Sequence, residues 1–329
     1  MSRGIGEFGF IQDAIPEWLA VVIAVLTQLG DVWFLALVVT LCYWYGVPNR
    51  DAIAVLGGIW LAGMGLYKGL KDIFGFPRPD EPLLDPDLLP IVIEQLYEFT
   101  AFASGYGFPS GHAVNTTIVY FGLAHVLTVS TRPRRYAVAA ALVTFVSFSR
   151  VALGVHYLVD VVVGVAIGFL LLFGARQFAD YALPDPSSTA LAAAVAFGGF
   201  FVVASGADSD AVLLLALSLG AFAGWQLVSI GRALVEVGPL ANAVRPVSIR
   251  VTLAAIAIAP LVVSLEYFPL LSVYSAGGVA GLLTAVAVTI PVAHHSPHAR
   301  HVGAVIVGQF RRVVGAVRRL LSSAQQRLS

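Results

Sequence analysis

Long apolar runs alternate with short polar segments along almost the whole chain. A membrane-spanning helix needs about 20 mostly apolar residues, and nine runs come near that length. They cover residues 32–47, 52–70, 113–129, 136–152, 157–174, 190–206, 211–229, 250–267 and 272–293. The pattern predicts an all-α fold, a polytopic transmembrane helical bundle of about nine spans.

The chain before the first run is also apolar over residues 16–29, but Gly30 and Asp31 separate the two stretches. We therefore expect an interfacial or re-entrant N-terminal segment that leads into the first span. The extreme N-terminus lacks a clean apolar stretch followed by a small-residue cleavage site, so we expect no cleavable signal peptide.

The composition strengthens the membrane assignment. The 329 residues are 58% hydrophobic and 12% charged, with a mean hydropathy of +0.87, whereas soluble domains carry about 25% charged residues. The net charge of zero says nothing about partners, and the single Cys42 cannot form an internal disulfide. We expect the lipid bilayer and a lipid as partners and no nucleic acid; the sequence does not indicate an oligomeric state.

Pro184 and Pro186 divide the chain. We expect a core membrane domain of about five spans over residues 1–183 and an accessory four-span region over 184–296. Residues 297–329 carry arginines among valines and leucines, which predicts a basic amphipathic helix on the membrane surface. A disordered basic tail is the alternative.

The distribution of arginine predicts the orientation. In the nine-span arrangement, 14 of the 19 basic residues, including those of the tail, fall on one side of the membrane. The positive-inside rule makes that side cytoplasmic. The loop 71–111 and the turn at 154–156 then face the extracytoplasmic side.

Three polar clusters fall on that outer side. The first is KDIFGFPRP, in which prolines flank Arg78 and Lys71 precedes it. An ammonium and a guanidinium fork suit a phosphate. The alternative is a pair of interfacial cations that reach toward lipid headgroups.

The second cluster is PSGH, at the start of the third long span. Ser110 is a natural helix N-cap, Gly111 permits close approach of an anion to the backbone, and His112 can supply a proton. A plain capped helix start explains the same residues without chemistry.

The third cluster is SRVALGVHYLVD. Arg150 ends one span, Gly154 allows a turn, and His156 and Asp160 stand four residues apart, as on one helix face. A carboxylate on one imidazole nitrogen leaves the other nitrogen as a nucleophile or base. A buried pair without chemistry is the alternative.

Together the clusters supply oxyanion donors, a nucleophile with an orienting acid, and a separate proton donor. This is the inventory for phosphoryl transfer through a covalent intermediate. No acidic cluster suited to Mg²⁺ accompanies them, so we expect no metal and no other cofactor.

The clusters also resemble the signature of the type 2 phosphatidic acid phosphatase superfamily, which includes membrane lipid phosphatases and soluble vanadium haloperoxidases. That signature is Lys, six residues and Arg-Pro; Pro-Ser-Gly-His; and Ser-Arg, five residues, His, three residues and Asp. Every signature position matches over residues 71–160, and the resemblance covers about 18–175.

The resemblance implies a role for each residue and a metal-independent reaction. His156 would attack phosphorus and form a phosphohistidine, Asp160 would orient His156, and His112 would protonate the leaving oxygen. The phosphate oxygens would be held by Lys71, Arg78, Ser110, Gly111 and Arg150.

We therefore predict an integral membrane phosphatase for a lipid-linked phosphate or diphosphate, at the outer membrane interface of the cell membrane. A polyprenyl diphosphate is the preferred substrate, followed by phosphatidate-like and phosphatidylglycerophosphate-like lipids. A lipid phosphotransferase that uses the same intermediate is the alternative enzyme, and a lipid or ion transporter is the alternative outside enzymes. Residues 88–104 predict an amphipathic helix, either a lid over the site or a plain interfacial helix.

Overall fold

A computed structural model describes residues 4–5, 7–46, 49–79, 81–86, 89–101, 104–178, 185–236 and 240–295. All the regular secondary structure in these ranges is helical, which agrees with the all-α prediction. The predicted amphipathic tail over residues 297–329 lies outside the described part.

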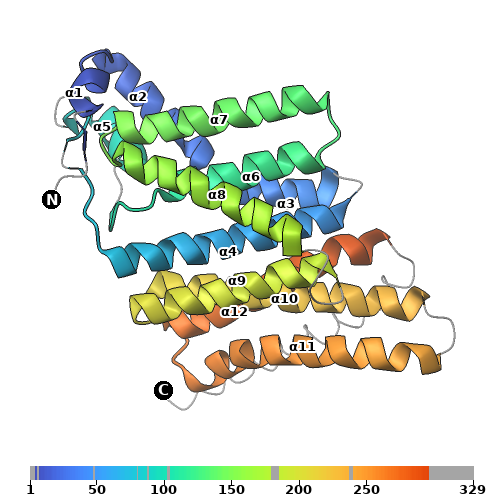
Figure 1. Cartoon of the computed structure of the whole chain (residues 1–329). Helices are drawn as coiled ribbons and strands as arrows, with labels where there is room; N and C mark the ends of the chain where they lie inside the picture. Colours follow the sequence, from blue (N-terminus) through green and yellow to red (C-terminus); the bar gives the residue numbers. More distant parts are fainter. Residues whose placement is uncertain are drawn as a thin grey trace.

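The first half of the chain forms α1 to α8, with a 3₁₀ helix and a π-helical turn between α2 and α4 (Figure 1). The bounds are α1 Glu7–Gln12, α2 Glu17–Leu26, η1 Thr27–Gly30, α3 Val32–Leu41, η2 Cys42–Gly46, α4 Arg50–Phe74, α5 Ile91–Ala101, α6 Gly111–Val126, α7 Arg132–Ala152 and α8 Leu158–Phe178. The second half forms α9 Pro186–Ser205, α10 Ser209–Glu236, α11 Leu240–Tyr267 and α12 Val273–His295.

Capping residues explain where several helices begin. The side chains of Asp31, Asn49 and Asp185 accept hydrogen bonds from the first-turn amides of α3, α4 and α9, at 2.7, 3.1 and 2.7 Å. At the other end of α4, Gly75 takes a left-handed conformation with φ of 60°. These local signals place the helix ends at the polar breaks of the sequence.

The predicted break at Gly30 and Asp31 is confirmed. Residues 27–30 form η1, and the segments on either side of the break, Trp18–Gly30 and Val32–Tyr45, are bent by 46°. This geometry fits either a broken span or a re-entrant loop.

The count of nine spans is not confirmed. Among the described residues, seven helices are long and apolar enough to cross a membrane, and the bent pair would make eight. The difference lies in α6, whose 16 residues extend only about 24 Å, less than the roughly 30 Å of hydrocarbon in a bilayer. Because several of its helices are long and apolar enough to cross a bilayer, the chain is nevertheless a multi-pass membrane protein.

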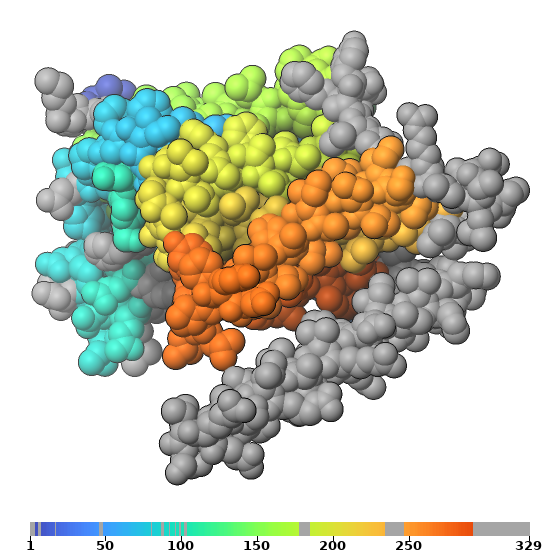
Figure 2. Space-filling model, turned by 90° about the horizontal axis from the view of Figure 1, so that it is seen from below, coloured from blue at the N-terminus to red at the C-terminus, as the bar shows by residue number. Residues whose placement is uncertain are grey.

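The second half packs on the first through α9, which lies along α4 (Figure 1). Two glycines of α4 allow this contact, since a Cβ on Gly58 would come 2.9 Å from Ala190 Cβ and one on Gly65 would come 2.5 Å from the Phe197 carbonyl oxygen. Figure 2, from below, shows the yellow and orange segments of the second half over much of that side of the molecule. The boundary near residue 184 stays a prediction, and the helices on its two sides share one hydrophobic core.

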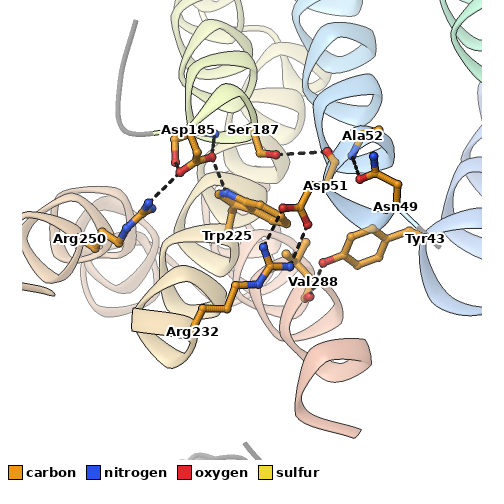
Figure 3. Close-up of polar contacts among 11 residues, drawn as sticks. Tyr43, Asn49, Asp51, Ala52, Asp185, Ser187, Trp225, Arg232, Arg250 and Val288 are labelled. Carbon is orange, nitrogen blue, oxygen red and sulfur yellow. Dashed lines mark hydrogen bonds and ion pairs between the residues drawn. The ribbon is translucent and has the colours of Figure 1, made fainter. Parts of the chain in front are cut away.

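A polar network joins α4, α9, α10 and α11 (Figure 3). It lies near the start of α4, whereas Lys71 lies near the end of that helix. Arg232 donates two hydrogen bonds of 2.8 Å to Asp51, and Arg250 donates one of 2.9 Å to Asp185. The indole of Trp225 also donates to Asp185, at 2.9 Å. Several of the arginines that predict the cytoplasmic side therefore lie at one end of the bundle.

Asp185 is held in its charged form by this network. Burial alone would raise the pKa of Asp185, but hydrogen bonds from Ser188, Trp225 and Arg250 outweigh burial and keep the pKa below its ordinary value. Asp185 therefore joins α9 to α10 and α11 within the second half, whereas the Arg232–Asp51 pair joins α10 to α4 of the first half.

Candidate active site

A cavity of about 590 Å³ opens at the end of the bundle where α4 ends and α6 begins. Six of the eight predicted site residues line it: Lys71, Arg78, Gly111, His112, Arg150 and His156. The other two, Ser110 and Asp160, are fully buried behind the wall. Three clusters that lie up to 89 residues apart in the chain thus meet around one cavity.

The turn between α7 and α8 positions His156. Both Val155 and His156 donate their amides to the Arg150 carbonyl oxygen at 3.2 Å, and Gly154 has φ of 69°. A Cβ on Gly154 would overlap the Glu81 carbonyl oxygen. The predicted glycine turn is confirmed, and it has a steric as well as a conformational reason.

His156 is 2% exposed and contacts an ionisable group through each ring nitrogen. Nε2 lies 3.0 Å from Nη1 of Arg78, and Nδ1 lies 3.4 Å from Oδ2 of Asp160. Because a guanidinium can only donate, Nε2 carries the lone pair and Nδ1 carries the proton toward Asp160. Burial first, and then the charges of Arg78 and Lys71, hold the pKa of His156 well below its ordinary value. The ring is therefore neutral, as a nucleophile requires.

Asp160 is positioned independently of His156. Its Oδ2 accepts the Tyr157 amide at 3.0 Å, as the third residue of a helix does in a capping box. Its carbonyl oxygen accepts the Ser110 amide at 2.9 Å, which joins the starts of α8 and α6. The expected pairing of His156 with Asp160 is present, but α8 begins only at Leu158, so the two residues do not share one helix face. The His156–Asp160 contact forms across the capping turn instead.

The cations of the first cluster are held by carbonyl oxygens that the sequence analysis did not identify. Lys71 Nζ donates to Tyr106 at 2.7 Å, and Arg78 donates to Ser104, Gly105 and Val155 at 3.1, 3.0 and 2.9 Å. Burial lowers the pKa of Arg78 to about 10, so the guanidinium stays charged at neutral pH. Carbonyl groups orient these cations without neutralising them.

Arg150 is 2% exposed and depends on another residue missed from the sequence. Its Nη1 donates to the hydroxyl of Thr27, at 3.4 Å, and the Ser149 hydroxyl is hydrogen bonded to the same oxygen at 2.7 Å. Thr27 belongs to η1, at the bend before α3. The N-terminal segment therefore contributes to the position of a cavity-lining guanidinium.

The predicted position of Ser110 as the N-cap of α6 is confirmed. The helix does begin at Gly111, but the Ser110 hydroxyl makes no capping hydrogen bond. Within the described residues, Ser110 Oγ, His112 Nε2 and Arg150 Nε are buried without a hydrogen-bond partner. Such atoms cost about 1–3 kcal/mol each. Of these residues, His112 and Arg150 line the cavity where an anion would bind, whereas the Ser110 hydroxyl is buried behind its wall.

Helix packing also requires a glycine at position 111, in addition to the expected close approach of an anion to the backbone. A Cβ there would come 2.6 Å from Cε2 of Tyr67 on α4, and Tyr67 also lines the cavity. Substitution would therefore separate α6 from α4 at the cavity wall.

The helices of the second half form the opposite wall, which the sequence analysis did not predict. Lys68 and Asp72 of α4 face this wall, together with four residues of α9, α10 and the turn between them: Phe201, Ser205, Asp208 and Asp210. In the described part of the chain, no group of three or more His, Cys, Asp or Glu side chains is arranged to hold a metal ion.

Comparison with known proteins identifies the family of this chain. The family model of the PAP2 superfamily matches residues 52–184. Phosphatidylglycerophosphatase B of Bacillus subtilis (strain 168) is 30% identical over 180 residues, which cover 49% of this chain and 75% of that protein. The chain belongs to the PAP2 superfamily. All eight predicted site residues lie within the part of this PAP2 protein that the family model matches.

Other relatives of this PAP2 protein are also named as lipid phosphatases. Lipid phosphate phosphatase delta of Arabidopsis thaliana is 36% identical over 110 residues, 31% of this chain and 25% of that protein. Lipid A 4'-phosphatase of Porphyromonas gingivalis is 26% identical over 129 residues, 39% of this chain and 52% of that protein. The chain thus spans only a quarter to a half of these two relatives.

A solved structure also resembles this PAP2 protein over part of its length. The crystal structure of a transmembrane PAP2 type phosphatidylglycerolphosphate phosphatase from Bacillus subtilis matches with a TM-score of 0.42 and 25% identity. The match covers 54% of this chain and 84% of that one.

Proposed function

We propose that this PAP2 protein is a membrane phosphatase that hydrolyses a lipid-linked phosphate or diphosphate through a phosphohistidine on His156. The observation that carries the proposal is the orientation of His156, whose Nε2 carries its lone pair inside a cavity lined by Lys71, Arg78 and Arg150. The names of its relatives, all lipid phosphatases, support the same reaction class.

The first step forms a bond from Nε2 of His156 to phosphorus as the bond to the leaving oxygen breaks. Arg78 holds the lone pair of Nε2 in a hydrogen bond, and a phosphate oxygen would take over that donor and release the nitrogen. Lys71, Arg150, the Ser110 hydroxyl and the Gly111 amide would hold the remaining oxygens. Asp160 would stabilise the positive charge that develops on the ring.

Burial, and then the charge of Arg150, hold the pKa of His112 well below its ordinary value in the free protein, and the negative charge of a bound phosphate would raise that pKa. His112, protonated in the complex, would then give its proton to the leaving oxygen, which yields the lipid alcohol or lipid monophosphate. Water then attacks phosphorus and gives a proton back to His112, the nitrogen–phosphorus bond breaks, and phosphate leaves. Nothing in this sequence of steps requires a metal ion.

The site would lie at the extracytoplasmic interface, with the arginine-rich end of the bundle in the cytoplasm. A lipid could then present its headgroup while its tail stays in the bilayer. Polyprenyl diphosphate remains the substrate preferred from the sequence, with phosphatidate-like and phosphatidylglycerophosphate-like lipids next. Resolution of the phosphohistidine by a lipid or sugar hydroxyl would make the protein a phosphotransferase instead.

The decisive experiment measures phosphate release from these lipids in detergent with EDTA, for the wild type and for His156→Ala. We expect release by the wild type and none above background by the variant. The matched control is His125→Ala, because His125 lies at the other end of α6 and contacts Tyr136. Equal release by the wild type and His156→Ala would refute the nucleophile. Phosphate recovered on another acceptor would favour the phosphotransferase.

A further inference from the structure

One face of α4 carries a tyrosine between a buried tryptophan and the proposed phosphate site. Tyr67 precedes Lys71 by four residues and follows Trp60 by seven, so all three lie on one side of the helix. This helix packs beside α6 (Figure 1), on which Asn115 follows His112 by three residues. The side chains of Tyr67 and Asn115 line the same cavity as Lys71 and His112. The proposed function uses neither of them.

Three side chains of this region form a series of hydrogen bonds. The indole of Trp60 donates to Oδ1 of Asn115 at 3.1 Å, and Nδ2 of Asn115 donates to the hydroxyl oxygen of Tyr67 at 3.4 Å. All three side chains are buried. An indole nitrogen can only donate, so the amide oxygen of Asn115 faces Trp60 and its NH₂ group faces Tyr67. The donors and acceptors of the series are therefore fixed by chemistry.

This direction leaves the hydroxyl proton of Tyr67 for a ligand. The NH₂ group of Asn115 can only donate, so the phenol oxygen accepts and its own proton is directed elsewhere. Within the described residues, the Tyr67 hydroxyl donates no hydrogen bond. Because Tyr67 lines the cavity, a bound molecule would supply the acceptor.

The Tyr67 hydroxyl lies beside the start of α6. Its oxygen is 3.1 Å from the position that a Cβ on Gly111 would take, and two ring carbons are 2.6 and 2.8 Å from it. Gly111 is the first residue of α6, where backbone amides have no partner within the helix. A phosphate oxygen that accepts the Gly111 amide would therefore lie within reach of the Tyr67 hydroxyl.

Two other buried polar atoms at this cavity also lack a partner. His112 Nε2 and Arg150 Nε have no hydrogen-bond partner in the part of the chain that the structure describes, and both side chains line the cavity. A bound phosphate would accept from Arg150 and Tyr67, and from His112 once that ring is protonated. Donors from α4, α6 and α7 thus surround one volume.

We propose that Tyr67 is a further catalytic residue, whose hydroxyl donates a hydrogen bond to an oxygen of the phosphate next to Gly111. Asn115 is then a positioning residue, because it occupies the phenol oxygen as an acceptor and leaves the proton to the phosphate. A neutral donor stabilises the anion in a water-poor site without adding to the repulsion among the cations. The inference rests on the proposed function, since it concerns the same phosphate.

The test removes the hydroxyl alone. Tyr67→Phe keeps the ring that packs against Gly111, and isothermal titration calorimetry in detergent measures the affinity for inorganic phosphate. We expect this affinity to fall about tenfold, as for loss of a hydrogen bond to a charged group. We expect kcat/KM for phosphate release from lipid phosphate to fall at least as much. An unchanged phosphate affinity in Tyr67→Phe would overturn the inference.

The matched control is Tyr43→Phe. It also removes a hydroxyl from a buried tyrosine, one that donates to the Val288 carbonyl oxygen outside the cavity lining (Figure 3). We expect a lower melting temperature with unchanged phosphate affinity and kcat/KM. An equal fall in phosphate affinity in both variants would attribute the effect to general destabilisation and overturn the role of Tyr67.

A double-mutant cycle tests the positioning role of Asn115. Asn115→Leu is similar in size but cannot donate to Tyr67, so we expect phosphate affinity to fall about threefold. The same substitution in Tyr67→Phe should cause no further fall in affinity. Loss of stability from the unpaired Trp60 indole would be the same in both backgrounds. Equal losses of phosphate affinity in both backgrounds would therefore overturn the positioning role.

Phosphate binding separates this inference from the proposed nucleophile. The same titration is made on His156→Ala with and without Tyr67→Phe, where no turnover is required. Weaker binding in the double variant supports Tyr67 even if His156→Ala still releases phosphate and the proposed nucleophile is refuted. Equal affinities in the two proteins, or no phosphate binding in the wild type, would overturn the inference.

Discussion

Arg78 donates a hydrogen bond of 3.0 Å to Nε2 of His156, and three backbone carbonyl groups hold the same guanidinium in place. The contact joins the first and third sequence clusters, 78 residues apart. It also assigns the ring tautomer, because the only proton-bearing nitrogen left is the one that faces Asp160. Arg78 therefore orients the proposed nucleophile, and the same guanidinium would bind the phosphate.

Arg78→Lys should abolish most of the activity while retaining the positive charge. A single ammonium cannot satisfy three carbonyl groups and His156 at once, and loss of one such donor costs about 10²–10³-fold in rate. We expect kcat/KM for lipid phosphate to fall about 100-fold. Arg134→Lys, at the opposite end of the bundle on α7, should leave kcat/KM near the wild-type value. A loss below tenfold in Arg78→Lys would show that the fork geometry is unimportant.

Thr27→Val should weaken catalysis by releasing Arg150. Valine has nearly the same shape but lacks the hydroxyl that contacts both Ser149 and Arg150. We expect kcat/KM to fall about tenfold and the free energy of unfolding to fall by about 1–3 kcal/mol. Thr27→Ser restores the hydroxyl and should recover the rate. Failure of Thr27→Ser to recover it would argue for a packing role alone.

Gly154→Ala should destabilise the turn that carries His156. Its φ of 69° is unfavourable for alanine, and the added Cβ would overlap the Glu81 carbonyl oxygen. We expect a loss of about 1–3 kcal/mol in stability together with loss of phosphate release. Gly57→Ala on α4 has nothing within 4 Å of the added Cβ and should be neutral or stabilising by up to about 1 kcal/mol. Thermal unfolding in detergent compares the two; similar melting temperatures would contradict the strained turn.

The pH dependence of stability should report the neutral state of His156. Its pKa is lowered well below the ordinary value in the folded protein, so near and below pH 6.5 the unfolded chain binds a proton that the folded chain does not. Stability should therefore fall as pH drops below about 6.5. His156→Gln removes this contribution, so the variant should lose less stability than the wild type between pH 8 and pH 5. Parallel curves would show that His156 is not held neutral.

Asp185→Ala should reduce stability without a direct effect on the chemistry. The substitution removes the cap of α9, the acceptor of the Trp225 indole and one of the two side-chain acceptors of Arg250, for a loss of about 1–3 kcal/mol. Because the pKa of Asp185 is lowered, its contribution is complete above about pH 4 and disappears as pH falls through the folded pKa. Chemical denaturation of both proteins at pH 7 measures the difference. Asp51→Ala, whose side chain is half exposed, should cost less.

Much of the fold was predictable because the sequence features that begin, end and bend helices act within a few residues. Apolar runs, the Gly30–Asp31 break and the proline at residue 186 mark helix positions that the structure shares, and Gly154 marks its turn. The span count was less predictable, because α6 has the composition of a span without the length. Ser110 is the N-cap residue of α6, as predicted, but its hydroxyl makes no capping hydrogen bond.

The candidate site was predictable where it consists of residues close together in the chain. Lys71 and Arg78, Ser110 to His112, and Arg150 to Asp160 each form one short motif with recognisable chemistry. No short motif identifies the other groups at the site, which are Thr27, the carbonyl groups of residues 104–106 and Asp208. A threonine, a backbone oxygen or a surface aspartate has its role only through the partner that folding brings to it.

Local patterns therefore specify the membrane helices and the three polar motifs, because hydropathy, capping and charge spacing act within a few residues. Tertiary packing brings Arg78 to Nε2 of His156 and Thr27 to Arg150, and it places carboxylates of α10 and the α9–α10 turn at the cavity. Those contacts join residues 78, 123 and 142 positions apart. They depend on how whole helices pack, which is set by the glycine contacts of α4 and by shape across the core rather than by any local pattern.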